Sequence, residues 1–253
     1  MLLDHIRPSH VATASEIDYL FLQQIHEIRA MTPEYLLFWT LCSKVLTHAL
    51  RQLDPDRLGM VVTLVQCMPP SRDGKIHSLR ERMSFGNPPW SNDVEQHSIF
   101  LGAESLVGHV VRRGHLDSVQ DLRSVPALLP AYQAEHEISA TACPILYATR
   151  VAGCMLVSST QPNYFLASNR LALVNDYAHL LALAFAPEHF YSSDLIDLRF
   201  MPPIDIQRRY LASFQQRVST RMSASHTLSR TKVEQIVWQE IEEELIRHDL
   251  NKP

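Results

Sequence analysis

The spacing of apolar residues predicts a long amphipathic helix near the start of the chain. Between positions 35 and 53 the apolar residues recur every four positions, at Leu37, Leu41, Val45, Ala49 and Leu53. This spacing places them along one face of an α-helix. Thr32, Pro33 and Glu34 precede the run and supply a capping residue, a proline in the first turn and an early carboxylate. We therefore expect the helix to begin here.

The pattern then changes to that of β-strands. Residues 60–65 form a short β-rich run, and residues 76–85 are expected to be its antiparallel partner. The residues between the runs include two prolines and an Asp-Gly pair, which are typical of turns. If the second strand alternates regularly, one of its faces carries Leu79, Glu81, Met83 and Phe85.

Five further segments follow in the second half of the chain. Residues 102–113 predict a short helix and residues 116–122 a strand. Residues 141–146 and 151–158 predict a second hairpin. Residues 168–185 have apolar residues at helical spacing, and the proline at position 187 ends this last helix.

The C-terminal part of the chain predicts a linker and two helices. Residues 188–204 contain a Pro-Pro pair and are expected to form the linker. The first helix, 206–222, is rich in arginine, whereas the second, 231–248, has an apolar stripe with glutamates around it. The carboxylates at positions 242–244 would repel phosphate, which argues against a helix-turn-helix that reads nucleic acid. We expect the two helices to pair with each other or with a partner protein.

Composition places the chain among ordinary globular proteins. Its 253 residues are 46% hydrophobic and 20% charged, which allows a sizeable core. The formal net charge of −4 gives no overall attraction for nucleic acid, so direct nucleic-acid binding is not expected. No run approaches the roughly 18 apolar residues of a membrane span, and residues 1–10 lack the apolar core of a signal peptide. We therefore expect a cytoplasmic protein that does not enter the membrane.

Four stretches carry a resemblance to a known family. Residues 102–111, Gly-Ala-Glu-Ser-Leu-Val-Gly-His-Val-Val, look like a helix opening with small residues. Residues 117–122, Asp-Ser-Val-Gln-Asp-Leu, look like the strand and loop that follow. Residues 139–145 look like a central strand, and residues 151–165 like the last strand and its turn into a closing helix. Together these stretches resemble the GAF domain, a small-molecule-sensing module of signalling proteins, most closely over residues 102–186.

The resemblance implies an α+β fold, with a GAF-like antiparallel β-sheet flanked by helices and helical extensions at both ends. It divides the chain into an N-terminal helical lead-in at 1–31, a GAF-like domain at 32–187, and a linker with a C-terminal helical extension at 188–253. The function it implies is that of a ligand-binding regulatory sensor in signal transduction, with the ligand and any cofactor left open. Exposed helix stripes predict a homodimer built by helix packing, or partner contact through the C-terminal helices.

The resemblance also implies where a ligand would bind, because GAF ligands lie between the sheet and the loop-and-helix layer that covers one face. Aromatic walls with a few polar groups suit such a site. Glu81 is a candidate because a carboxylate among apolar neighbours is costly to bury without a partner. Alternatively, a bulge or a sheet edge leaves it solvated. The candidate ligand-binding residues are Glu81, Phe85, Trp90, Asp121, Tyr132, His136, Ser139 and Cys143.

The sequence predicts no catalytic residue and no metal site. Some GAF proteins are free methionine-(R)-sulfoxide reductases, which use cysteine thiolates, so a thiol enzyme of this kind is one alternative. The cysteines here have no basic neighbours in sequence that would lower their pKa, which favours inert, buried thiols. The 13 histidines include no H-E-x-x-H or close Cys/His group. A ligand-free dimerisation or scaffold module is a further alternative.

Overall fold

One antiparallel sheet organises the molecule. The computed structural model describes residues 16–90, 99–124, 136–224 and 228–250. Within these residues six strands pair in the order β3-β2-β1-β6-β5-β4, and every pairing is antiparallel. The predicted α+β fold and both predicted hairpins are confirmed. The strands are β1 (Met60–Cys67), β2 (Leu79–Gly86), β3 (Phe100–Leu101), β4 (Asp117–Val119), β5 (Ser139–Tyr147) and β6 (Arg150–Ser159).

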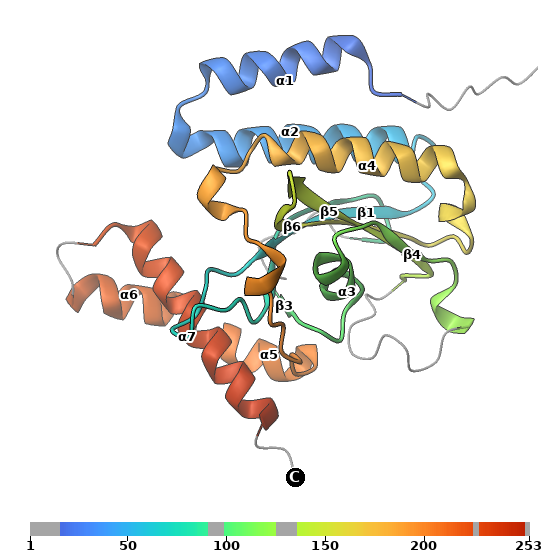
Figure 1. Cartoon of the computed structure of the whole chain (residues 1–253). Coiled ribbons are helices and arrows are strands. Elements are labelled where there is room, and N and C mark those ends of the chain that lie inside the picture. Colours follow the sequence, from blue (N-terminus) through green and yellow to red (C-terminus); the bar gives the residue numbers. More distant parts are fainter. Residues whose placement is uncertain (1–15, 91–98, 125–135, 225–227, 251–253) are drawn as a thin grey trace, which may run out of the picture.

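Three helices cover one face of the sheet. They are α1 (Tyr19–Met31), α2 (Glu34–Leu53) and α4 (Ser168–Ala182). In Figure 1, α2 and α4 lie directly over the sheet and α1 lies on their outer side. Helix α2 begins at Glu34, directly after Pro33, as the sequence predicts. The five apolar residues of its predicted stripe are all buried.

The main core lies between this helical layer and the sheet. Leu41 and Val45 of α2, Leu64 of β1 and Met155 of β6 have no exposed surface. Burying an aliphatic side chain of this size stabilises a fold by about 1.5–3 kcal/mol. Tyr177 of α4 is equally buried, and its hydroxyl satisfies its hydrogen bonds with side chains of α2, including the His48 imidazole at 2.6 Å.

A single short helix, α3 (Leu106–Arg113), packs on the opposite face of the sheet. Ser105 caps this helix, because its hydroxyl accepts a hydrogen bond from the Gly108 N–H at 3.0 Å. A Cβ at Gly108 would lie 2.0 Å from the carbonyl oxygen of Gly102. Only glycine fits this contact, so the small residues of the predicted helix opening allow a close approach between segments. A second core cluster beneath α3 includes Val65, Leu79, Val110 and Cys154.

A β-bulge in β2 changes which side chains face α3. Leu64 of β1 pairs with Met83, but the next residue, Val65, pairs with Glu81, so Arg82 is the extra residue. Glu81 therefore lies on the α3 side with Val65, whereas Met83 and Phe85 contact the core under α2 and α4. The prediction that Glu81 shares a face with Met83 and Phe85 is wrong, because it assumed regular alternation.

The segment expected as a linker pairs with the sheet. Its backbone forms two hydrogen bonds with Val151 through Tyr191, at 2.9 Å each. Further along, the Ile76 N–H donates to the Leu195 carbonyl, and the Arg199 N–H donates to the His77 carbonyl. Residues 191–199 are therefore part of the folded body of the protein.

Three helices follow at the β3 edge of the sheet (Figure 1): α5 (Ile204–Leu211), α6 (Phe214–Ala224) and α7 (Arg230–Leu250). The single helix predicted for 206–222 is thus divided into α5 and α6. A third core cluster joins them to the sheet edge. None of the described helices is long and apolar enough to cross a membrane. The members of the third cluster include Met68, Phe100, Met201, Val218, Val233, Val237, Ile241 and Leu245.

Candidate functional site

The sheet face beneath α3 carries small and hydroxyl-bearing side chains. Val65 and Cys154 belong to the core under α3, and residues two positions along each strand share their face. On this face the hydroxyls of Thr63 and Ser84 lie 2.7 Å apart. Such short side chains leave room above the strands. Strand pairing places five more residues on this face: Val61, Ala140, Ala142, Leu156 and Ser158.

Part of this face is open to solvent. On the helix-backed face, Val62, Leu64 and Val157 of the central strands have 0% exposed surface. On the α3 face of the same strands, Val61 and Leu156 keep solvent contact, and Glu81 of β2 does so as well. A fully covered face would bury these positions equally. These three positions show where the α3 face of the sheet is in contact with solvent.

Two carboxyl groups lie at this face. Glu81 comes from β2, and Glu137, two residues before the start of β5, is 7% exposed. The Ser158 hydroxyl donates a hydrogen bond of 2.5 Å to the Glu137 carboxylate. Burial, together with the smaller effect of the negative charge of Glu137, raises the pKa of Glu81 to about 8. Glu81 is therefore mostly protonated at neutral pH and can donate a hydrogen bond.

Trp90 lies at one end of the same face. A Cβ atom placed on Gly86 would lie 3.0 Å from the Trp90 Cβ and 3.5 Å from the Val61 Cβ. Trp90 therefore lies close to Val61. Its indole Nε1 is buried and has no hydrogen-bond partner among the described residues. Buried polar atoms are usually paired in folded proteins. Trp90 thus offers an apolar wall and an N–H donor at the candidate site.

Asp121 and His136 lie near the end of the sheet where Glu137 enters. The backbone hydrogen bond from Leu122 to Ile138 holds the Asp121 loop against this segment at 2.8 Å. Asp121 is partly exposed, and its hydrogen bonds with Arg123 lower its pKa. His136 is exposed and has a positive φ of 75°. Tyr132, the other candidate from this region, lies outside the described residues.

Phe85, Ser139 and Cys143 lie on the opposite face. Phe85 contacts the core under α2 and α4, and Cys143 is 1% exposed there. The Cys143 thiol lies 3.5 Å from the Asn175 side chain of α4. Ser139 donates to the carbonyl of Gln161 at 2.7 Å. The expectation that these three residues stand near the α3 layer is corrected, because strand alternation and the bulge direct them to the helix-backed side.

Sequence reasoning missed Glu137, Ser158, Thr63 and Ser84. Glu137 stands between two residues that were chosen, but nothing in the local pattern marks it as buried. Ser158 follows a continuous apolar run in β6. This position could have indicated a hydroxyl that points into the protein. Thr63 and Ser84 become neighbours only through the register of β1 with β2, which the sequence does not contain.

All four cysteines are buried and free. Burial raises the pKa of Cys42, Cys67 and Cys143 to about 12, and it raises the pKa of Cys154 as well. A thiolate is the reactive form of cysteine, so these environments suppress nucleophilic chemistry. Within the described residues, no group of three or more His, Cys, Asp or Glu side chains is placed to hold a metal ion.

A scan against protein families matches the GAF domain over residues 40–185, which is more than half of the chain. The chain belongs to the GAF domain family. GAF domains are typically regulatory modules that sense signals and bind small molecules. The search of curated proteins found no match.

Solved structures similar to this GAF protein include domains of different functions. A type II free methionine-R-sulfoxide reductase from Thermoplasma acidophilum is 18% identical, with a TM-score of 0.44, over 62% of this chain and 99% of its own. The GAF domain of an Acinetobacter phosphoenolpyruvate-protein phosphotransferase is 15% identical, with a TM-score of 0.44, over 66% and 93%. The A. aeolicus nlh2 GAF domain is 16% identical, with a TM-score of 0.42, over 66% and 93%. At these values, none of them assigns a ligand or an activity to this chain.

Proposed function

We propose that this GAF protein is a ligand-responsive regulator that binds a small molecule on the α3 face of its sheet. The observation that carries the proposal is the pair of carboxyl groups, Glu81 and Glu137, beside a partly solvent-open floor of short side chains. Trp90 supplies an apolar wall with an N–H donor that has no partner among the described residues. The conformational change caused by ligand binding would be transmitted to a second subunit or a partner through the terminal helices.

The carboxyl pair favours a ligand that donates hydrogen bonds, such as a primary amine. A charged amine would be attracted by the Glu137 carboxylate and would also favour ionisation of Glu81, since opposite charges lower a carboxyl pKa. A purely anionic ligand would meet the same Glu137 charge that raises the pKa of Glu81. We therefore place amines ahead of phosphates in the search for the ligand.

A thermal-shift screen with small amines, amino acids and cyclic nucleotides tests the proposal. We expect at least one amine to stabilise the protein by about 2.7 kcal/mol at a concentration 100-fold above its Kd. Glu81→Gln should weaken this effect, because glutamine cannot supply the negative charge. Glu27→Gln, which alters an exposed glutamate of α1, should leave it unchanged. A screen without any stabilising compound would favour the ligand-free scaffold module instead.

The reductase alternative makes a different prediction about the thiols. Because all four cysteines are buried with raised pKa values, we expect a thiol reagent to modify the native protein slowly and the denatured protein fully. We also expect no thioredoxin-dependent turnover of free methionine sulfoxide. If the protein shows turnover and Cys143→Ser or Cys154→Ser abolishes it, the reductase interpretation replaces the regulatory one.

A further inference from the structure

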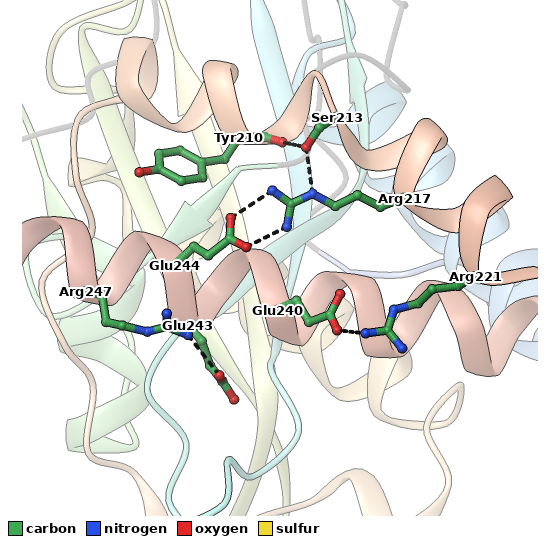
Figure 2. A network of polar contacts seen from close by, with 8 residues as sticks. All are labelled: Tyr210, Ser213, Arg217, Arg221, Glu240, Glu243, Glu244 and Arg247. Carbon is green, nitrogen blue, oxygen red and sulfur yellow. Dashed lines mark hydrogen bonds and ion pairs between the residues drawn. The ribbon is translucent and has the colours of Figure 1, made fainter. Parts of the chain in front are cut away.

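Helices α6 and α7 are joined by matched charges (Figure 2). Arg217 holds Glu244 through two hydrogen bonds of 2.7 and 2.8 Å, and Arg221 pairs with Glu240. Arg217 also donates to the Ser213 hydroxyl at 2.8 Å, which connects the pair to the end of α5. On this side of α7 these two carboxylates each have an arginine partner.

The side of α7 that faces the sheet is different. Glu242 is 1% exposed, and the Ser78 hydroxyl donates to its Oε1 at 2.5 Å. Its Oε2 has no hydrogen-bond partner among the described residues. Arg80 of β2 is 7% exposed, and its guanidinium lies 3.9 Å over the Trp238 ring. Its Nε is also without a partner in this set, and none of the described ion pairs joins Arg80 to Glu242.

This arrangement favours a neutral Glu242. An ionised carboxylate is costly to bury when one of its oxygens is unsatisfied. Burial raises the pKa of Glu242 to about 7, and the neighbouring Glu243 acts in the same direction. The Ser78 hydrogen bond, His77 and Arg80 act in the opposite direction but do not outweigh burial. The interface therefore contains a carboxyl that can gain or lose a proton near neutral pH.

We propose that the packing of α7 on the sheet edge is controlled by the protonation of Glu242. The helix stays docked when the carboxyl is neutral, and it separates from the sheet more often when the carboxyl is ionised. The separated state exposes the apolar stripe of α7, Val233, Val237 and Ile241, which is otherwise covered. This inference does not depend on whether the α3 face binds a ligand.

The direction of the pH effect follows from the two states. In the separated helix Glu242 has the usual carboxyl pKa of 4.5, whereas in the docked helix its pKa is about 7. The docked state thus binds its proton more tightly, so docking is strongest below pH 4.5 and weakens as the pH rises to about 7. For these two values the opening equilibrium constant increases about 70-fold between pH 5 and pH 8.

A thiol probe on the sheet side of the interface can measure this opening. Met68 is 4% exposed and belongs to the cluster that α7 covers, so Met68→Cys places a thiol that reacts only when the helix leaves. Labelling rates at pH 5–8 are divided by the rate for the same thiol in denaturant, which removes the intrinsic effect of thiol ionisation. Mass spectrometry follows Cys42, a buried residue of α2, in the same sample as a control for global unfolding.

Three variants of the probe protein decide the result. We expect its opening constant to rise by one to two orders of magnitude from pH 5 to pH 8. Adding Glu242→Gln should reduce this rise to less than about threefold, because glutamine does not titrate. Adding Glu243→Gln should preserve the rise. A flat profile in the parent would overturn the proposal, as would a rise that survives Glu242→Gln or equal labelling of Cys42.

Discussion

Glu81 and Glu242 are acids whose surroundings in the folded protein favour the neutral form. Removing a carboxylate from water disfavours its charged form, and in both positions burial is the largest influence on the pKa. The neighbours then differ. Glu81 faces another carboxyl, that of Glu137, whereas Glu242 faces Ser78 and Arg80. The environment of Glu81 suits the binding of a ligand, and that of Glu242 suits the packing of α7 on the sheet.

At the scale of single residues, we predict that Glu81 makes the stability of the protein depend on pH. Its pKa is about 8 in the folded protein and 4.5 when exposed, so stability is highest below pH 4.5 and declines as the pH rises to 8. Because Glu81 keeps some solvent contact, we expect a loss of about 1–3 kcal/mol between pH 5 and pH 8. Urea unfolding should show a smaller loss in Glu81→Gln. An identical pH profile in that variant would contradict the assignment.

At the scale of elements, β2 is the strand that connects three parts of the molecule. Glu81 points to the α3 face, Met83 to the core under α2 and α4, and Arg80 to α7. Ser78, the residue before the strand, also contacts α7. A shift of this strand would therefore change the packing at the α3 face, in the core under α2 and α4, and at α7. Phe100 of the neighbouring strand β3 is hydrogen-bonded to Gln207 of α5, which is 3% exposed.

We predict that Gln207→Ala destabilises the C-terminal helices. The Gln207 side chain accepts from the Phe100 N–H at 2.8 Å and donates to the carbonyls of Phe100 and Pro202 at 2.9 Å. Removing it leaves buried backbone groups unsatisfied, at a cost of about 2–4 kcal/mol. Gln216→Ala, at an exposed position of α6, should cost less than about 0.5 kcal/mol. Equal unfolding midpoints in denaturant for the two variants would show that the Gln207 hydrogen bonds do not stabilise the protein.

Particular residues explain how much the sequence could predict. The four-residue spacing of Leu41, Val45 and their neighbours suffices for α2, because helix periodicity is a local property. The bulge at Arg82 is set by the register with β1, so it could not be read from an alternating segment. For the same reason Glu81 could be chosen as a candidate, while its proximity to Glu137 could not be predicted. The site is assembled by pairing between distant strands.

At the scale of the whole molecule, one corner exposes large apolar side chains. Near the connection of α1 to α2, Met31 is 84% exposed, Tyr35 79% and Trp39 47%. Exposed apolar patches often mark contact surfaces. This corner is the surface that we assign to the homodimer expected from helix packing.

We predict that Tyr35→Glu combined with Trp39→Glu shifts the protein from dimer to monomer. Charged side chains at the centre of an apolar interface oppose association, because they would have to be desolvated. Sedimentation velocity over a range of concentrations measures the change. Leu166→Glu, at a position 66% exposed before α4, serves as the control and should leave the dimer intact. A wild-type protein that stays monomeric at high concentration would remove the homodimer from the proposal.

The pairing of residues 191–199 with the sheet affects how the chain can be shortened. The family match ends at residue 185, yet backbone groups of Ile76, Ala103 and Val151 find their hydrogen-bond partners between Tyr191 and Arg199. Cutting the chain at the end of the match would leave these groups unpaired at a sheet margin. Unpaired margins attract strands from other molecules. A truncated protein ending at Phe185 is therefore expected to aggregate on expression, whereas the full chain keeps this margin covered.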